Sequence, residues 1–79
     1  MTYEQILDEI RRQLDFRLIY NLIKESRAVV YLDSYSLRKL IAGNDFDVVD
    51  YNLMTIYGMR VYEVKTEMTH INVAEMYNM

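Results

Sequence analysis

The feature that most restricts the fold is a long helical pattern at the start of a short chain. Thr2 followed three residues later by Gln5 matches a capping box, which marks a helix N-terminus. Apolar residues then recur at the spacing of one helix face, at Tyr3, Ile6, Leu7, Ile10 and Leu14. A second group continues the pattern: Phe16, Leu18, Ile19, Tyr20, Leu22 and Ile23. We therefore expect a first helix, with helical character to about Glu25.

The length of this helix is a problem for a compact molecule. About 24 helical residues at a rise of 1.5 Å would span about 36 Å. A compact chain of 79 residues is only roughly 30 Å across. Either the helix breaks near Asp15, which could serve as a new N-cap, or it protrudes and packs against a partner. We favour the break.

Chain length and composition indicate one small domain, residues 1–79, with a thin core. At 79 residues, folding buries only about 60% of the surface that the unfolded chain exposes. The absence of Cys excludes disulfides and thiolate metal sites, so stability must come from packing or from association. The apolar fraction of 52% argues against disorder.

The remaining residues predict strands around one short helix. The apolar run 28–32 is typical of a central strand buried on both faces. Asp33 or Ser34 then caps a short helix that ends at Gly43. Residues 44–50 could form a loop or an edge strand, and both alternatives stay open.

The C-terminal third is expected to be extended. Residues 53–57 form one extended segment, and Gly58 marks a bulge or sharp bend. Residues 59–65 and 70–76 are expected to pair as a hairpin through 66–69. The predicted fold is α+β, with the N-terminal helix, broken or not, packed on a mostly antiparallel sheet of three or four strands and one short helix between strands.

The sequence offers little material for catalysis. The chain has a single His and only two Gly, so the common nucleophile and phosphate-binding motifs have no place in it. Asp45, Asp47 and Asp50 lack the pattern of a calcium loop and are interpreted as a solvated acidic segment. We expect no enzyme activity, no cofactor and no bound metal.

Charge and hydropathy restrict the partners. Residues 1–27 carry five basic and five acidic side chains, so the net charge of −3 arises in residues 28–79. An acidic surface repels phosphate backbones, and we expect no direct nucleic-acid binding. No apolar run approaches the roughly 20 residues of a membrane span. The N-terminus resembles neither a secretory nor a transit signal, which favours a cytoplasmic location and no membrane contact.

Tyrosine enrichment points to protein recognition, because its rigid ring gives contact area at low entropic cost. Six of the eight tyrosines follow residue 27. The expected protein-binding residues are Asp45, Asp47, Asp50, Tyr51, Tyr57 and Tyr62. The expected self-association residues, at the contact of a homodimer, are Phe16, Ile19, Tyr20 and Ile23.

Residues 28–64 also carry a recognisable layout. A strand over 28–32, a short helix over 34–42 and a strand launched by Gly58 resemble the peripheral domain of tailed-phage major capsid proteins. The chain is too short to be a capsid protein, so the resemblance implies a small phage or mobile-element product and transfers no functional residue. Proteins of that kind often work by binding and blocking a host protein, including host defence nucleases, or serve as virion accessories.

We therefore expect a non-enzymatic protein-binding module. Its sharper form is a phage-encoded inhibitor that blocks a host defence or nucleic-acid-handling protein in the host cytoplasm through an acidic, tyrosine-rich surface. The alternative is a self-associating structural or virion accessory subunit, which the high apolar content and the long helical pattern favour.

Overall fold

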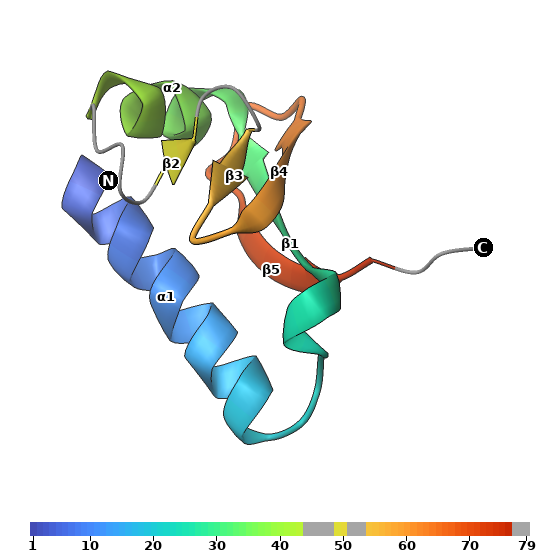
Figure 1. Ribbon diagram of the computed structural model, residues 1–79. Coiled ribbons are helices and arrows are strands. Elements are labelled where there is room, and N and C mark those ends of the chain that lie inside the picture. Colours follow the sequence, from blue (N-terminus) through green and yellow to red (C-terminus); the bar gives the residue numbers. More distant parts are fainter. Residues whose placement is uncertain (44–48, 51–53, 77–79) are drawn as a thin grey trace.

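The computed structural model describes residues 1–43, 49–50 and 54–76 (Figure 1). Its elements follow in the order α1 (Tyr3–Ile19), η1 (Glu25–Arg27), β1 (Ala28–Asp33), α2 (Ser34–Ala42), β2 (Val49–Asp50), β3 (Thr55–Ile56), β4 (Met59–Val64) and β5 (Ile71–Glu75). The α+β class predicted from the sequence is confirmed. No helix in the described part of the chain is long and apolar enough to cross a membrane.

Helix α1 begins where the sequence predicts and runs without a break. The Thr2 hydroxyl accepts from the Gln5 main-chain N–H at 3.2 Å, and the Gln5 side chain accepts from the Thr2 N–H at 2.8 Å. The expected break at Asp15 is wrong, because this residue lies inside the helix, exposed and 3.9 Å from the Arg11 guanidinium. The 17 residues of α1 span about 26 Å, which fits a molecule whose longest dimension is 31 Å.

The helix ends at Ile19, so helical character to Glu25 is also wrong. Asn21 adopts a φ of 55°, the left-handed conformation that Asn tolerates better than most residues. The Leu22 N–H donates to the Arg17 carbonyl at 2.8 Å, and the Asn21 N–H donates to the Leu18 carbonyl at 3.1 Å. This pair of bonds is a Schellman motif, which satisfies the last carbonyls of the helix. The apolar pattern therefore continues past the residue at which the backbone turns.

The described strands form a five-stranded mixed sheet in the order β2-β3-β4-β1-β5, and three of its four pairings are antiparallel. Strand β1 is paired along both edges, as its apolar run predicts, but it is not fully buried on both faces, because Tyr31 on its second face is only half-buried. It pairs in parallel with β4, where Val30 opposes Val61, and antiparallel with β5, where Val30 opposes Val73. The expected hairpin between residues 59–65 and 70–76 is wrong, because β1 lies between these two strands. The most apolar strand is therefore an interior strand of the sheet, as are β3 and β4.

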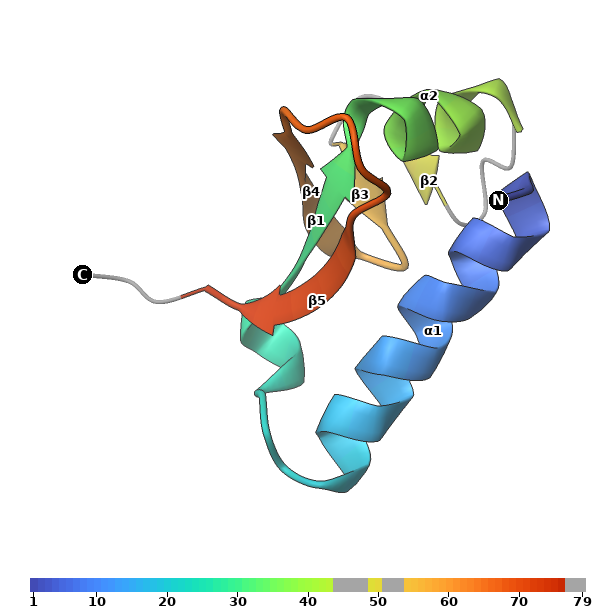
Figure 2. The ribbon, with the colours of Figure 1, turned by 180° about the vertical axis from the view of Figure 1, so that it is seen from behind.

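Both helices cover the same face of the sheet (Figures 1 and 2). Alternate residues of β1 point toward them, and Val30 and Leu32 are fully buried there together with Ile6, Ile10 and Leu40. Val29 and Tyr31 point the other way, by the period-two alternation of a strand. The core is therefore one layer between α1, α2 and one side of the sheet.

Asp33 joins β1 to α2 and caps the helix. Its carboxylate accepts from the Ser36 N–H at 3.0 Å, the Ser36 hydroxyl at 2.6 Å and the His70 N–H at 3.0 Å. Only 4% of Asp33 is exposed. Burial raises the pKa of this carboxyl, but the hydrogen bonds from His70 and Ser36 outweigh burial and hold its pKa below the usual value.

Glycine is favoured at two positions, Gly43 at the end of α2 and Gly58 in the turn between β3 and β4. Gly43 ends α2 as predicted, and a Cβ there would overlap the Tyr3 ring, 2.8 Å from its Cζ. Gly58 has a φ of 78° and follows Tyr57 at 51° in the two-residue turn that joins β3 to β4. The sharp bend expected at Gly58 is thus confirmed. Of the segment 44–50, Val49–Asp50 form the edge strand β2, and 44–48 lie outside the described residues.

Candidate functional site

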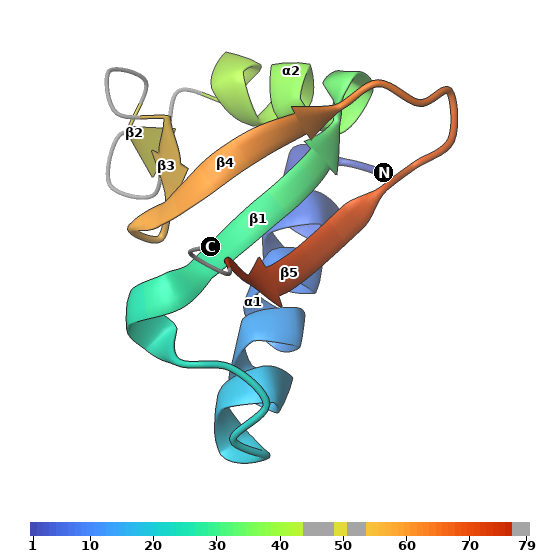
Figure 3. The same ribbon diagram turned by 90° about the vertical axis from the view of Figure 1, so that its right-hand side faces the viewer.

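The side of the sheet opposite the helices forms the candidate site. We define the open sheet face by six residues that point away from the core: Val29 and Tyr31 of β1, Arg60 and Tyr62 of β4, Ala74 of β5, and Met76 directly after β5. Figure 3 looks onto this face, with both helices behind the sheet. Strand register places these residues side by side, with Tyr31 opposite Tyr62 and Val29 between Arg60 and Ala74.

Two stacked tyrosines occupy the centre of the open sheet face. The ring centroids of Tyr31 and Tyr62 are 5.6 Å apart and the ring planes differ by 26°. The Tyr62 hydroxyl donates to the Met76 sulfur at 3.8 Å and accepts from an Arg60 guanidinium nitrogen at 3.5 Å. The contact with Tyr62 raises the pKa of Arg60, so this guanidinium stays charged. Arg60 and Met76 therefore hold the half-buried ring of Tyr62, and the half-buried Tyr31 ring stacks on it.

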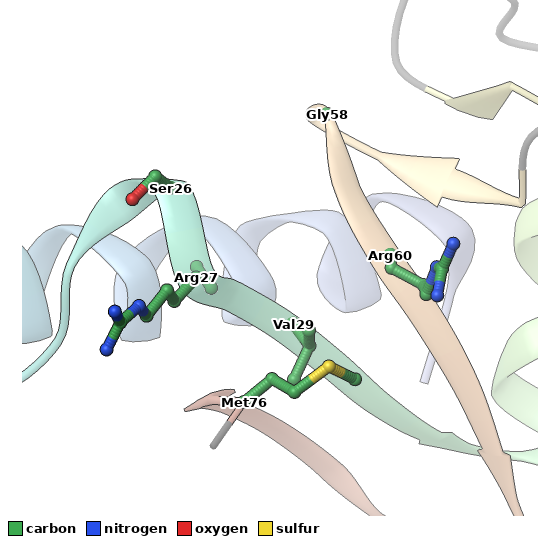
Figure 4. Close-up of a pocket in the computed structure, with 7 residues that line it drawn as sticks. Ser26, Arg27, Val29, Gly58, Arg60 and Met76 are labelled. Carbon is green, nitrogen blue, oxygen red and sulfur yellow. The ribbon is translucent and has the colours of Figure 1, made fainter. Parts of the chain in front are cut away.

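A cleft of about 250 Å³ lies at one end of the open sheet face. It is lined by Ser26, Arg27, Ala28, Val29, Gly58, Arg60 and Met76 (Figure 4). Val29 and Met76 lie between the two arginines in this view, with Arg27 on the side of the short helix η1 and Arg60 on β4. The cleft thus combines an apolar centre with a cation on each side.

The two arginines differ in their partners. The Arg27 guanidinium lies 3.9 Å from the Glu75 carboxylate, which also accepts from the Lys24 N–H at 2.8 Å. Among residues 1–43, 49–50 and 54–76, no carboxylate lies within ion-pair distance of Arg60. The candidate site therefore carries positive charge that the described part of the protein leaves unneutralised at Arg60.

The structure separates the residues predicted to bind a protein. Tyr62 lies on the open sheet face. Tyr57 lies in the turn before β4, where its ring packs against the core and the Arg11 guanidinium of α1 lies 5.4 Å from the ring centroid. Asp50 belongs to β2 at the far edge of the sheet. Asp45, Asp47 and Tyr51 lie outside the described residues.

Three of the four predicted self-association residues share one exposed region. We define the apolar tip of α1 by Phe16, Ile19, Tyr20 and Leu22, whose exposed fractions are 53%, 74%, 64% and 60%. The Phe16 and Tyr20 ring centroids are 4.8 Å apart. The fourth predicted residue, Ile23, packs against the core instead. The turn at Asn21 explains this difference, because it redirects the chain toward the sheet.

The sequence reasoning did not assign Tyr31, Arg60 or Met76 to the site. Alternation within 59–64 places Arg60 and Tyr62 on one side of a strand, which was a usable signal. The face on which Tyr31 lies could not be predicted, because the run Ala28–Leu32 has no alternation of polar and apolar residues. Met76 reaches the cleft only through the antiparallel pairing of β5 with β1, which no local pattern specifies.

Other chemistry is sparse in the part of the chain that is described. No group of three or more His, Asp or Glu residues there is arranged to hold a metal ion. The main chain of His70 is engaged by Asp33, since its N–H donates to the carboxylate and its carbonyl accepts from the Asp33 N–H at 3.0 Å. Comparison of the chain with protein-family models, with curated proteins and with solved structures gave no match.

Proposed function

We propose that this protein is a non-enzymatic protein-binding module and that the open sheet face is its contact surface. The observation that carries the proposal is the stacked Tyr31–Tyr62 pair at the centre of a sheet face that neither helix covers. Tyrosine is enriched at interface hot spots because it buries a large area with few rotatable bonds. A Tyr62 ring already held by Arg60 and Met76, with Tyr31 stacked on it, loses little further entropy on binding.

A more specific form of the proposal is an inhibitor of a host defence or nucleic-acid-handling protein, encoded by a phage or mobile element and acting in the host cytoplasm. The net charge of −3 supports this form, because an acidic small protein is attracted to a basic groove. Such a complex weakens steeply with salt. Titration of the purified complex between low and high ionic strength tests it, and an affinity independent of salt contradicts the electrostatic basis.

The binding surface is tested with tyrosine variants. Tyr31→Ala and Tyr62→Ala remove the stacked pair, and Tyr35→Ala is a matched control, since Tyr35 is 60% exposed on α2 and contacts Lys39. The tagged wild type is used to isolate a partner from host cells. The affinity of the purified partner for the wild type and for each variant is then measured by calorimetry. We expect truncation of either stacked ring to weaken binding by more than about 1 kcal/mol, whereas Tyr35→Ala binds as the wild type does. If Tyr31→Ala and Tyr62→Ala bind the partner as tightly as Tyr35→Ala and the wild type do, the assignment of this face is refuted.

A second candidate function is self-association as a structural or virion accessory subunit. The apolar tip of α1 supports it, because four large apolar side chains are exposed together on one small domain. In this form two copies bury the tip in a two-fold homodimer. The test is the molar mass of the wild type and of Ile19→Glu by light scattering. Met68→Glu is the control, since Met68 is 77% exposed but lies away from α1, between β4 and β5. A wild type that is monomeric at high micromolar concentration contradicts self-association.

A further inference from the structure

We infer that the cleft beside the stacked tyrosines binds an extended acidic segment of the protein partner, in which one apolar side chain is flanked by carboxylates. This inference rests on the proposed protein-binding function in its general form, not on the form in which an acidic surface occupies a basic groove, and it specifies the chemistry of the ligand. The apolar side chain occupies the centre of the cleft, and the carboxylates engage Arg27 and Arg60.

The centre of the cleft is suited to an apolar group. Val29 and Met76 lie side by side there (Figure 4), and Ala28 contributes to the lining. Val29 is only 4% exposed, so this part is a closed floor and not a route into the core. The volume of about 250 Å³ is large enough to admit one aliphatic side chain. Burial of an aliphatic side chain against such a floor contributes about 1.5–3 kcal/mol when it is complete.

The two sides of the cleft are suited to carboxylates. The side chain of Arg27 remains 52% exposed, and its nearest carboxylate is 3.9 Å away. Arg60 is exposed, and its guanidinium donates to the Tyr62 hydroxyl. A guanidinium has five N–H donors and forms paired hydrogen bonds to a carboxylate. Both groups therefore keep donors for an incoming anion.

The geometry favours an extended segment. Side chains at positions i, i+2 and i+4 of an extended chain point to the same side, so an acid, an apolar residue and a second acid at this spacing meet the cleft together. Gly58 lies at the rim, and a Cβ added there would have no atom within 4 Å. The rim is thus open to the main chain of a ligand. A nucleic acid fits less well, because its continuous phosphates meet an apolar centre on a chain of net charge −3.

The test uses a fluorescein-labelled peptide, Gly-Ser-Glu-Ser-Leu-Ser-Glu-Ser-Gly, and fluorescence anisotropy. Two comparison peptides replace both Glu by Lys, or the Leu by Ala. We expect the Glu-Leu-Glu peptide to bind more tightly than either. Arg60→Gln and Arg27→Gln should each weaken its binding by roughly fivefold, the effect of one exposed ion pair worth about 1 kcal/mol. Arg38→Gln is the matched control, because Arg38 is exposed on α2, on the covered side of the sheet.

Equal binding of the Glu and Lys peptides, or an Arg60→Gln affinity equal to that of the wild type, overturns the inference. Each variant is first checked for wild-type thermal unfolding, which is expected because both arginine side chains are exposed at the surface. If Tyr62→Ala abolishes partner binding while the arginine variants do not affect it, the ligand assignment fails and the binding function stands. If the tyrosine variants also bind the partner normally, the proposed surface fails as well.

Discussion

The side-chain amide of Gln13 accepts a hydrogen bond from the main-chain N–H of Val73 at 2.9 Å. Its nitrogen donates to the Ile71 carbonyl at 2.8 Å and to the Glu9 carboxylate at 2.9 Å, so all its hydrogen-bonding groups are used. Val73 N–H and the Ile71 carbonyl lie on the edge of β5 that faces away from β1, where another strand would pair. One side chain of α1 therefore blocks the edge of the sheet and fixes the helix against it.

We predict that Gln13→Leu destabilises the protein by about 1–3 kcal/mol, because it leaves an N–H and a carbonyl of a part-buried strand without partners. Urea unfolding measures the change, and hydrogen exchange should be faster at Val73. Asp8→Asn, at an exposed position of the same helix, should leave both unchanged. Unaltered exchange at Val73 in Gln13→Leu would show that this contact does not protect β5.

Asp33 should contribute stability that depends on pH. Its folded-state pKa is below the usual value, so its contribution is fully present above the unfolded pKa of about 3.9 and is lost as the pH falls through the folded pKa. We expect Asp33→Asn to cost about 1.5–3 kcal/mol at pH 7. The cost should shrink in acid, where the wild type loses the same interaction. Urea midpoints between pH 2 and pH 7 measure it, and a cost that stays constant over this range would be inconsistent with a depressed pKa.

Gly43 and Tyr3 should be energetically coupled. The Gly43→Ala methyl group overlaps the Tyr3 ring, so the ring must move from its place against the core. We expect a loss of about 1–3 kcal/mol, and a smaller loss when the same change is made in Tyr3→Ala. A double-mutant cycle from thermal unfolding measures the difference. Additive losses would place the cost in the C-cap and not in the ring contact.

The end of α1 should depend on the left-handed residue Asn21. Asn21→Gly should preserve stability to within about 0.5 kcal/mol, because Gly adopts a positive φ without strain. Asn21→Val should cost about 1–2 kcal/mol, since a β-branched side chain opposes this conformation. Chemical unfolding of the two variants compares these costs. The control is Asn21→Ala, for which an intermediate value is expected, and equal stability of all three variants would contradict a conformational origin.

Local signals in the sequence predicted the individual elements well. The Thr2–Gln5 capping box, the strand 28–32, the capped short helix and the bend at Gly58 are each specified by residues close together in the chain. The end of α1 was missed because the apolar spacing continues through Leu22 and Ile23, whereas the stop depends on the backbone conformation of a single Asn.

Strand order and the candidate site were harder to predict. Residues 59–65 and 70–76 are neighbours in the sequence, and this short separation predicts a hairpin. Strand β1 is more apolar than either of these segments, and it lies between them instead. The cleft could not be anticipated for the same reason. Arg27, Arg60 and Met76 meet only after β1 has paired on both sides.

The central position of β1 has a consequence for how the chain folds. Val30 pairs with Val61 and Val73, which lie 31 and 43 residues later in the chain. Such distant pairs carry a loop-closure cost before any contact repays it, so we expect slow folding for a chain of this size. Until the last strand arrives, β1 has an unpaired edge open to intermolecular pairing. A chain truncated before residue 70 would therefore leave this edge of β1 unpaired, and we expect it to aggregate.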